Sequence, residues 1–94
     1  MNLGPVGEKI TEKLNNALSP LSLNVIDESQ KHAGHAGARP EGETHFKVQI
    51  VSERFEGMSL VARHRLVNEI LADELNTRVH ALAISASPPP KEGE

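Results

Sequence analysis

The chain has 94 residues, a net charge of −3 at pH 7 and no cysteine, and these properties exclude several classes of protein. The length allows one domain. With no Trp or Tyr and only two Phe, the core is expected to be built from aliphatic side chains. The acidic balance argues against broad, sequence-independent binding of nucleic acid, which rests on basic surface. Lack of cysteine excludes disulfides, a cysteine nucleophile and any metal centre held by the chain's own thiolates.

The sequence carries no sign of membrane insertion or export. No stretch approaches the roughly 20 apolar residues that a membrane-spanning helix needs. The N-terminal segment MNLGPVGEK has neither the apolar run of a secretory signal nor the Arg- and Ser-rich character of an organelle transit peptide. We therefore expect a cytoplasmic protein that makes no contact with membranes.

A helix and a strand are predicted before residue 30. Residues 6–18 repeat apolar side chains at helical spacing on one face: Val6, Ile10, Leu14, Ala17 and Leu18. Pro5 suits the first turn, where its missing N–H has no partner in any case, and Ser19-Pro20 ends the helix. Residues 21–28 then alternate as a half-buried strand whose inner side chains are Leu21, Leu23 and Val25.

The connection at residues 29–43 is long, which is typical of functional or disordered loops. A second strand is predicted at residues 44–52, where apolar and polar side chains alternate. Residues 60–75 predict one helix, capped by Ser59, with an apolar stripe of Leu60, His64, Val67, Leu71 and Leu75. Residues 79–86 predict a third strand. We expect residues 1–86 to form the domain and residues 87–94 to be a disordered, Pro-rich tail.

The order helix, strand, strand, helix, strand predicts an α/β fold. The first two strands can pair antiparallel across the long connection. The second strand, the second helix and the third strand form a right-handed βαβ unit, so the third strand runs parallel to the second. Both helices then cover one face of a three-stranded mixed sheet, which gives a two-layer sandwich with αββαβ order.

Histidines are the main candidates for chemistry. The stretch KHAGHAGARPEGETH (residues 31–45) places His32 and His35 among residues that cannot pack a core. They are either solvated loop residues or part of a metal site, and a loop alone cannot pre-form such a site. A ligand from a rigid element is needed, and His80, one residue into the third strand, is the natural candidate. His80 would otherwise merely cap the edge of the core.

The other candidates carry weaker signals. His64 lies on an apolar stripe and is expected to be a hydrogen-bonded core histidine, whereas His45, on the polar face of its strand, is expected to have no special role. Arg63 and Arg65 form a solvated face or meet phosphate. Ser29 lacks the strand–turn–helix context of a hydrolase nucleophile, so we expect no enzyme activity.

Several ordered motifs in residues 6–86 resemble those of the BolA family. They are DES at 27–29 followed by His32, THFKV at 44–48, VS at 51–52, RFEG at 54–57, SL at 59–60, RHRLVN at 63–68, Leu71, EL at 74–75 and VHAL at 79–82. The run FEGMSLVARHRLVN and the VHAL strand are long and specific. The chain resembles most the bacterial members of this family whose loop carries a histidine.

This resemblance implies a fold like type II KH domains and a partnership with monothiol glutaredoxins. The two proteins would share a bridging [2Fe–2S] cluster used in iron–sulfur trafficking or iron sensing. A glutaredoxin cysteine and glutathione would supply two thiolates, and His80 would supply one nitrogen. The resemblance places the second nitrogen at His32, with His35 as the alternative. The free protein is expected to be a monomer.

Two other functions remain open at this stage. Some bacterial relatives are described as DNA-binding transcriptional regulators of stress response and cell morphology. Phosphate contacts would then come from the basic residues Arg54, Arg63, Arg65 and Lys47. The acidic net charge weakens that hypothesis. The third alternative is a scaffold whose histidines bind no metal, in which case glutaredoxin would bind equally well without them.

Overall fold

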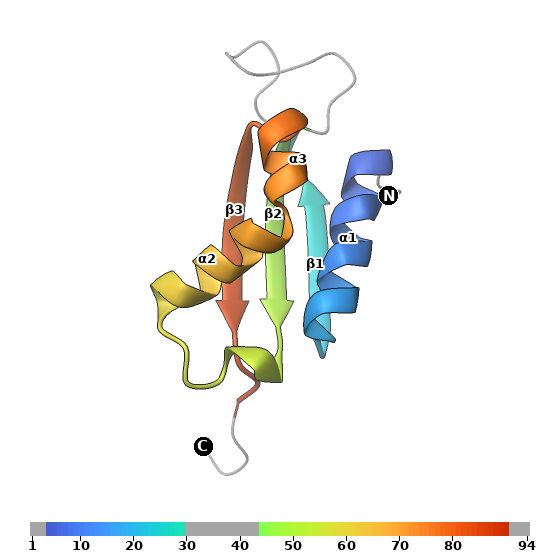
Figure 1. Cartoon of the computed structure of the whole chain (residues 1–94). Coiled ribbons are helices and arrows are strands. Elements are labelled where there is room, and N and C mark those ends of the chain that lie inside the picture. The colour runs from blue at the N-terminus through green and yellow to red at the C-terminus, as the bar shows by residue number, and fades with distance from the viewer. Residues whose placement is uncertain (1–3, 30–43, 91–94) are drawn as a thin grey trace.

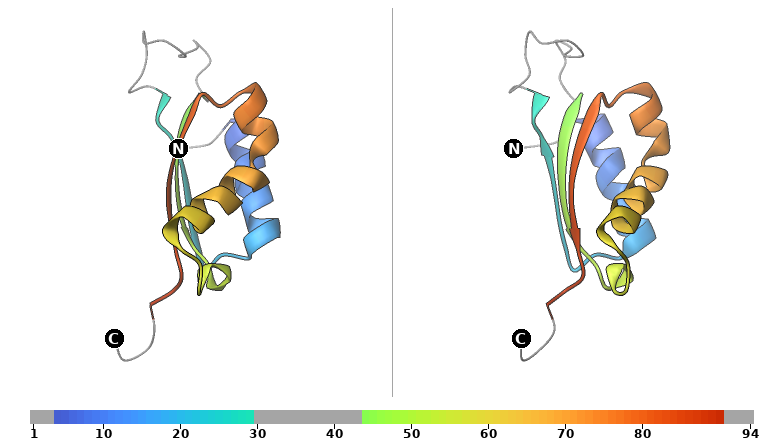
Figure 2. Two further views of the ribbon diagram at one scale, coloured as in Figure 1. Left: turned by 60° about the vertical axis from the view of Figure 1, so that its left-hand side comes forward. Right: turned by 90° about the vertical axis from the view of Figure 1, so that its left-hand side faces the viewer.

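The computed structural model of the protein describes residues 4–29 and 44–90. Its elements are α1 (Pro5–Leu18), β1 (Ser22–Asp27), β2 (His45–Val51), the 3-10 helix η2 (Glu53–Phe55), α2 (Leu60–Ile70), α3 (Ala72–Thr77) and β3 (Ala81–Ser87) (Figure 1). β2 lies in the middle of the sheet, antiparallel to β1 and parallel to β3. The helices cover one face of this sheet, as Figure 2 shows.

This architecture confirms the predicted α/β fold with a three-stranded mixed sheet and helices on one face. The likeness to type II KH domains stays a prediction. So does the division into a domain at 1–86 and a disordered tail at 87–94, because β3 ends at Ser87 and residues 91–94 lie outside the described part of the chain.

The core lies between the sheet and the helices. Alternate residues of β2 point into it, and each is at most 1% exposed: Phe46, Val48 and Ile50. Opposite them, α1 contributes Ile10 and Leu14. Fully burying a side chain of this kind is worth about 1.5–3 kcal/mol. Both phenylalanines of the chain, Phe46 and Phe55, are buried, so the core is aromatic at two points and otherwise aliphatic.

Two expected apolar contacts near the N-terminus are absent. Ala17 is exposed, because the buried face of α1 follows strict four-residue steps through Val6, Ile10, Leu14 and Leu18. Leu21 precedes β1 and is 65% exposed. Only the inner residues of β1, which pair with the centre of β2, pack against the core.

The predicted single helix at residues 60–75 is wrong in one respect, because it bends at Leu71. The backbone there adopts φ −101° and ψ 17°, which separates α2 from α3. The N–H groups of Leu71 and Leu75 still donate to carbonyls four residues earlier, at 3.1 and 3.0 Å. The bend keeps Leu71 buried while the helix axis changes direction (Figure 1). The segment contains no Gly or Pro that would have marked it.

The apolar stripe of this segment also begins later than predicted. Leu60 is 60% exposed and His64 is only half-buried, whereas Val67 is completely buried. The ribbon of α2 begins beyond the edge strand β3 and crosses towards the sheet along its length (Figure 1). His64 is therefore not a buried core histidine.

A salt bridge joins α1 to α3. Lys13 Nζ donates to Glu74 Oε1 at 2.9 Å and lies 3.8 Å from Asp73 Oδ2. The hydrogen bond to Glu74 raises the pKa of Lys13 above its ordinary 10.5; burial opposes this shift, and the charges of Glu74 and Asp73 add to it. A pKa raised by folding means that the ion pair stabilises the protein below pH 10.5 and loses this effect as pH rises through the folded pKa.

We predict that Lys13→Met lowers the thermal unfolding midpoint at neutral pH, and that the difference from wild type vanishes well above pH 10.5. The matched control is Lys9→Met, because Lys9 Nζ lies 3.7 Å from Glu12 in a pair with both side chains more than half exposed. Thermal unfolding followed by circular dichroism across this pH range measures both variants. An equal effect of the two substitutions would contradict the prediction.

Candidate functional site

One end of the sheet brings together residues that lie at or next to the ends of all three strands. β1 runs antiparallel to β2, and β3 runs parallel to it. The end of β1 and the starts of β2 and β3 therefore meet at the same end. The residues there form what we call the sheet-end cluster: Ser29, Thr44, His45 and His80.

Hydroxyl groups hold this cluster together. Ser29 Oγ accepts the backbone N–H of Thr44 at 2.9 Å and that of His45 at 3.3 Å. The N–H of Ser29 donates to Asp27 Oδ1 at 2.9 Å. Ser29 and Thr44 are buried, at 7% and 1% exposure. These bonds fasten the end of β1 to the start of β2, at the two residues that flank the segment 30–43.

His80 combines a fixed backbone with an accessible side chain. The N–H groups of His80 and Ala81 both donate to the carbonyl oxygen of Thr44, at 2.7 and 3.1 Å. The side chain of His80 is exposed, and within residues 4–29 and 44–90 no hydrogen bond reaches its imidazole. His80 lies directly before β3 rather than inside the strand as predicted. An accessible imidazole in this position is chemically suited to act as a metal ligand.

His45 is more buried than its position on the polar face of the strand predicts. It is 6% exposed, and its Nδ1 lies 2.8 Å from Thr44 Oγ1. Its ring centroid is 5.3 Å from that of His80, with the two planes tilted by 52°. The strand register explains this closeness, because His45 pairs with Ala81, the neighbour of His80.

The predicted loop ligands His32 and His35 lie outside the described residues, so their placement stays a prediction. Within the described ranges 4–29 and 44–90, no group of three or more His, Asp or Glu side chains is arranged to hold a metal ion. His80 is therefore the one predicted ligand whose surroundings the structure gives.

The four basic residues of the DNA-binding alternative do not form one surface. Arg63 is engaged within the fold, since its Nε donates to Met58 O and its Nη1 to Ala86 O, each at 3.1 Å. Arg54 and Arg65 are exposed on η2 and α2. Lys47 alternates with the core residues of β2 and so faces away from the helices.

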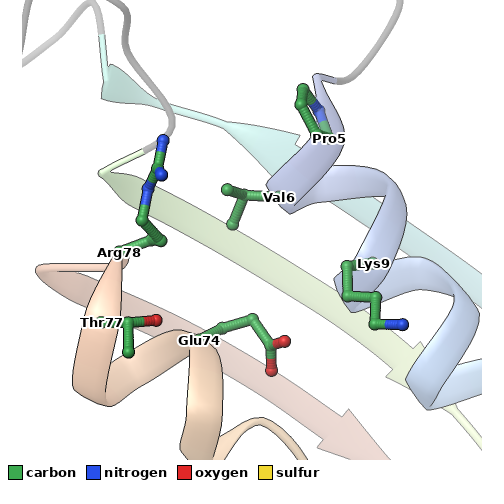
Figure 3. A pocket seen from close by; sticks show the side chains of 6 residues that line it. All are labelled: Pro5, Val6, Lys9, Glu74, Thr77 and Arg78. Atoms are coloured by element: carbon green, nitrogen blue, oxygen red, sulfur yellow. The ribbon is translucent and has the colours of Figure 1, made fainter.

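A pocket of about 290 Å³ lies between α1 and α3 (Figure 3). Its lining residues are Pro5, Val6, Lys9, Glu74, Thr77 and Arg78. Glu74 is already paired with Lys13 at 2.9 Å. None of the predicted functional residues lines this pocket.

The comparison with known families decides the assignment. The family model described as BolA-like protein matches residues 14–91. The chain belongs to the BolA family. It is 55% identical over 86 residues to BolA-like protein 1 of Mus musculus, covering 92% of this chain and 60% of that protein. It is 52% identical over 83 residues to the chloroplastic protein BOLA1 of Arabidopsis thaliana, covering 86% and 52%.

Solved structures of the BolA family share this fold. The BolA domain of SufE1 from Arabidopsis thaliana has a TM-score of 0.85 and 50% identity, with 94% of this chain and 96% of that domain covered. The solution structure of mouse BolA1 has a TM-score of 0.77 and 48% identity, with 93% and 68% covered.

The BolA-like chain spans only part of several relatives. It covers 24% of the chloroplastic/mitochondrial SufE-like protein 1 of Arabidopsis thaliana, to which it is 50% identical. Since that relative and plant BOLA1 are named for organelles, a cytoplasmic location stays a prediction. In the part of the chain that the structure describes, no helix has the length and apolar character needed to span a bilayer.

We predict that Ser29→Ala destabilises the fold, because it leaves the N–H of the buried Thr44 without its acceptor. A buried donor that loses its partner costs about 1–3 kcal/mol. The matched control is Ser22→Ala on the exposed side of β1, expected to stay within about 0.5 kcal/mol of wild type. Urea denaturation measures both, and equal midpoints would refute the role of Ser29.

Proposed function

We propose that this chain is a non-enzymatic adaptor that binds a monothiol glutaredoxin and shares a bridging [2Fe–2S] cluster with it, in iron–sulfur trafficking or iron sensing. The observation that carries the proposal is the exposed imidazole of His80, whose backbone is held against Thr44 at the end of the sheet. Membership of the BolA family supports it, because the family's pairing with glutaredoxins is what the sequence motifs imply.

The donor set of the chain fits a shared cluster. The protein has no cysteine, so it can supply no thiolate ligand of its own. Thiolates would come from the glutaredoxin and from glutathione. His80 would supply one nitrogen, and His32 the second, with His35 as the alternative. Two histidine ligands on one iron raise the reduction potential of a [2Fe–2S] centre relative to ligation by cysteine alone.

The experiment is an anaerobic titration of [2Fe–2S]-loaded monothiol glutaredoxin, with glutathione, against the wild-type protein and His80→Ala. Visible absorption and circular dichroism report the ligands of the cluster. We expect wild type to shift the spectrum to a new form and His80→Ala to abolish this shift. Parallel titrations of His32→Ala and His35→Ala identify the second ligand.

The matched control is His64→Ala, because His64 is also a partly accessible histidine but lies on α2, outside the sheet-end cluster. It should behave as wild type. Gel filtration of the same mixtures separates binding from ligation. If glutaredoxin binds while wild type leaves its spectrum unshifted, the protein is a scaffold and the shared-cluster function is wrong; an equal shift with wild type and His80→Ala contradicts the role of His80 as a ligand.

The alternative function is a DNA-binding regulator. The observation in its favour is that Arg54, on η2, and Arg65, on α2, are both exposed. The net charge of −3 opposes it, and so does the engagement of Arg63 with two backbone carbonyls. Arg63→Ala is consequently a poor test, because it disturbs the fold as well as the charge.

A sharper test measures duplex DNA binding against salt concentration for wild type, Arg54→Ala and Arg65→Ala. If these arginines contact phosphates, each substitution should reduce the slope of log K against log salt by about 1. Lys9→Met, on the surface of α1, controls for the loss of one positive charge. We expect the acidic protein to show no salt-dependent binding, and a slope that Arg65→Ala reduces would favour the regulator.

A further inference from the structure

We propose that His45 is a positioning residue for His80: its buried ring restricts the orientation of the exposed His80 imidazole before any partner arrives. This inference rests on the proposed function, in which His80 is a ligand. It concerns a residue that the sequence analysis had expected to have no special role.

The backbone of His80 is already fixed. Its N–H and that of Ala81 converge on the carbonyl oxygen of Thr44, at 2.7 and 3.1 Å. The strand register then pairs Ala81 with His45. The freedom that remains to His80 is rotation of its side chain, directly beside His45.

The ring of His45 is fixed as well. It is 6% exposed, and its Nδ1 is held by Thr44 Oγ1 at 2.8 Å. Thr44 Oγ1 is in turn 3.4 Å from Ser29 Oγ, in a buried part of the cluster. His45 thus belongs to the packed interior, whereas His80 is exposed.

The contact between the two rings limits how the His80 ring can rotate. Their centroids are 5.3 Å apart and their planes are tilted by 52°, within the range of favourable ring pairs. The rigid ring of His45 therefore excludes part of the rotational range of His80.

Such restriction matters for a ligand. In metal sites a ligating histidine is usually oriented by a hydrogen bond at its other nitrogen. Within residues 4–29 and 44–90, the His80 ring makes no hydrogen bond. The aromatic ring that it contacts in these ranges is that of His45. A side chain ordered in advance loses less entropy when the complex forms.

The test compares His45→Ala, which removes the ring, with His45→Phe, which keeps an aromatic ring at that position. Thr44→Val is the third variant, because it removes the hydroxyl that holds His45 Nδ1 and keeps the side-chain shape. His64→Ala is the control histidine. The first readout is the order of the His80 ring in the free protein, from NMR relaxation of ¹³C-labelled histidine. The second is the midpoint of the titration with [2Fe–2S]-loaded glutaredoxin and glutathione.

We expect His45→Ala to lower the order of the His80 ring and to move the titration midpoint to a concentration about tenfold higher, as for loss of an outer partner of a metal-binding histidine. His45→Phe should restore both values towards wild type. For Thr44→Val, both the order of the His80 ring and the titration midpoint should lie between the values of wild type and His45→Ala. A space-filling role alone would change thermal stability without changing the order of the His80 ring.

The proposal is overturned if His45→Ala leaves the order of the His80 ring and the midpoint unchanged, or if His45→Phe fails as His45→Ala does. Should His45→Ala not fold, wild-type behaviour of Thr44→Val in both measurements overturns it equally. Failure of the proposed function looks different, because wild type itself then leaves the glutaredoxin spectrum unshifted, and the positioning role falls with it.

Discussion

The parallel pairing of β2 with β3 is the contact on which both the fold and the site depend. Parallel neighbours cannot be joined by a tight turn, so the chain must cross over through a helix. Here α2 and α3 form that crossover, cover the sheet and return the chain to the end where β2 begins. Where the two strands begin to pair, the carbonyl oxygen of Thr44 accepts hydrogen bonds from the N–H groups of His80 and Ala81. That oxygen determines where the backbone of His80 lies.

The sheet-end cluster is stabilised differently from the core. Buried hydroxyls and N–H groups cost free energy unless they are hydrogen-bonded. Ser29 and Thr44 meet this requirement through each other, and in the described part of the chain no buried side-chain nitrogen or oxygen lacks a partner. Hydrogen-bond geometry is directional, whereas apolar packing is not. These hydrogen bonds therefore fix the backbone that carries the exposed imidazole of His80, and they leave the rotation of that side chain to its contact with His45.

Sequence periodicity could predict the strands, the first helix and the topology, because each depends on local alternation and on connection length. It failed where long-range geometry decides. Leu60 continues an apolar stripe but is 60% exposed, and the helix bends at the buried Leu71 without a Gly or Pro nearby. His45 has a polar strand position, yet its burial depends on β3 and on the hydroxyl of Thr44. For the site, sequence motifs indicated His80 but not the residue beside it.

The residues named for the two proposed functions lie mostly apart: the histidines gather at one end of the sheet, whereas the arginines lie on η2 and α2, and Lys47 is two residues after His45. β3 starts at Ala81, next to the sheet-end cluster, and reaches Ala86 at its far end, where Arg63 donates to the backbone. The same guanidinium also donates to the carbonyl oxygen of Met58, which precedes α2. Its two hydrogen bonds therefore link the start of α2 to the end of β3. A change in the histidines leaves this fastening intact, and a change in the arginines leaves the Thr44 acceptor intact. The two proposals can therefore be tested by substitutions at separate residues, His80 for one, and Arg54 and Arg65 for the other.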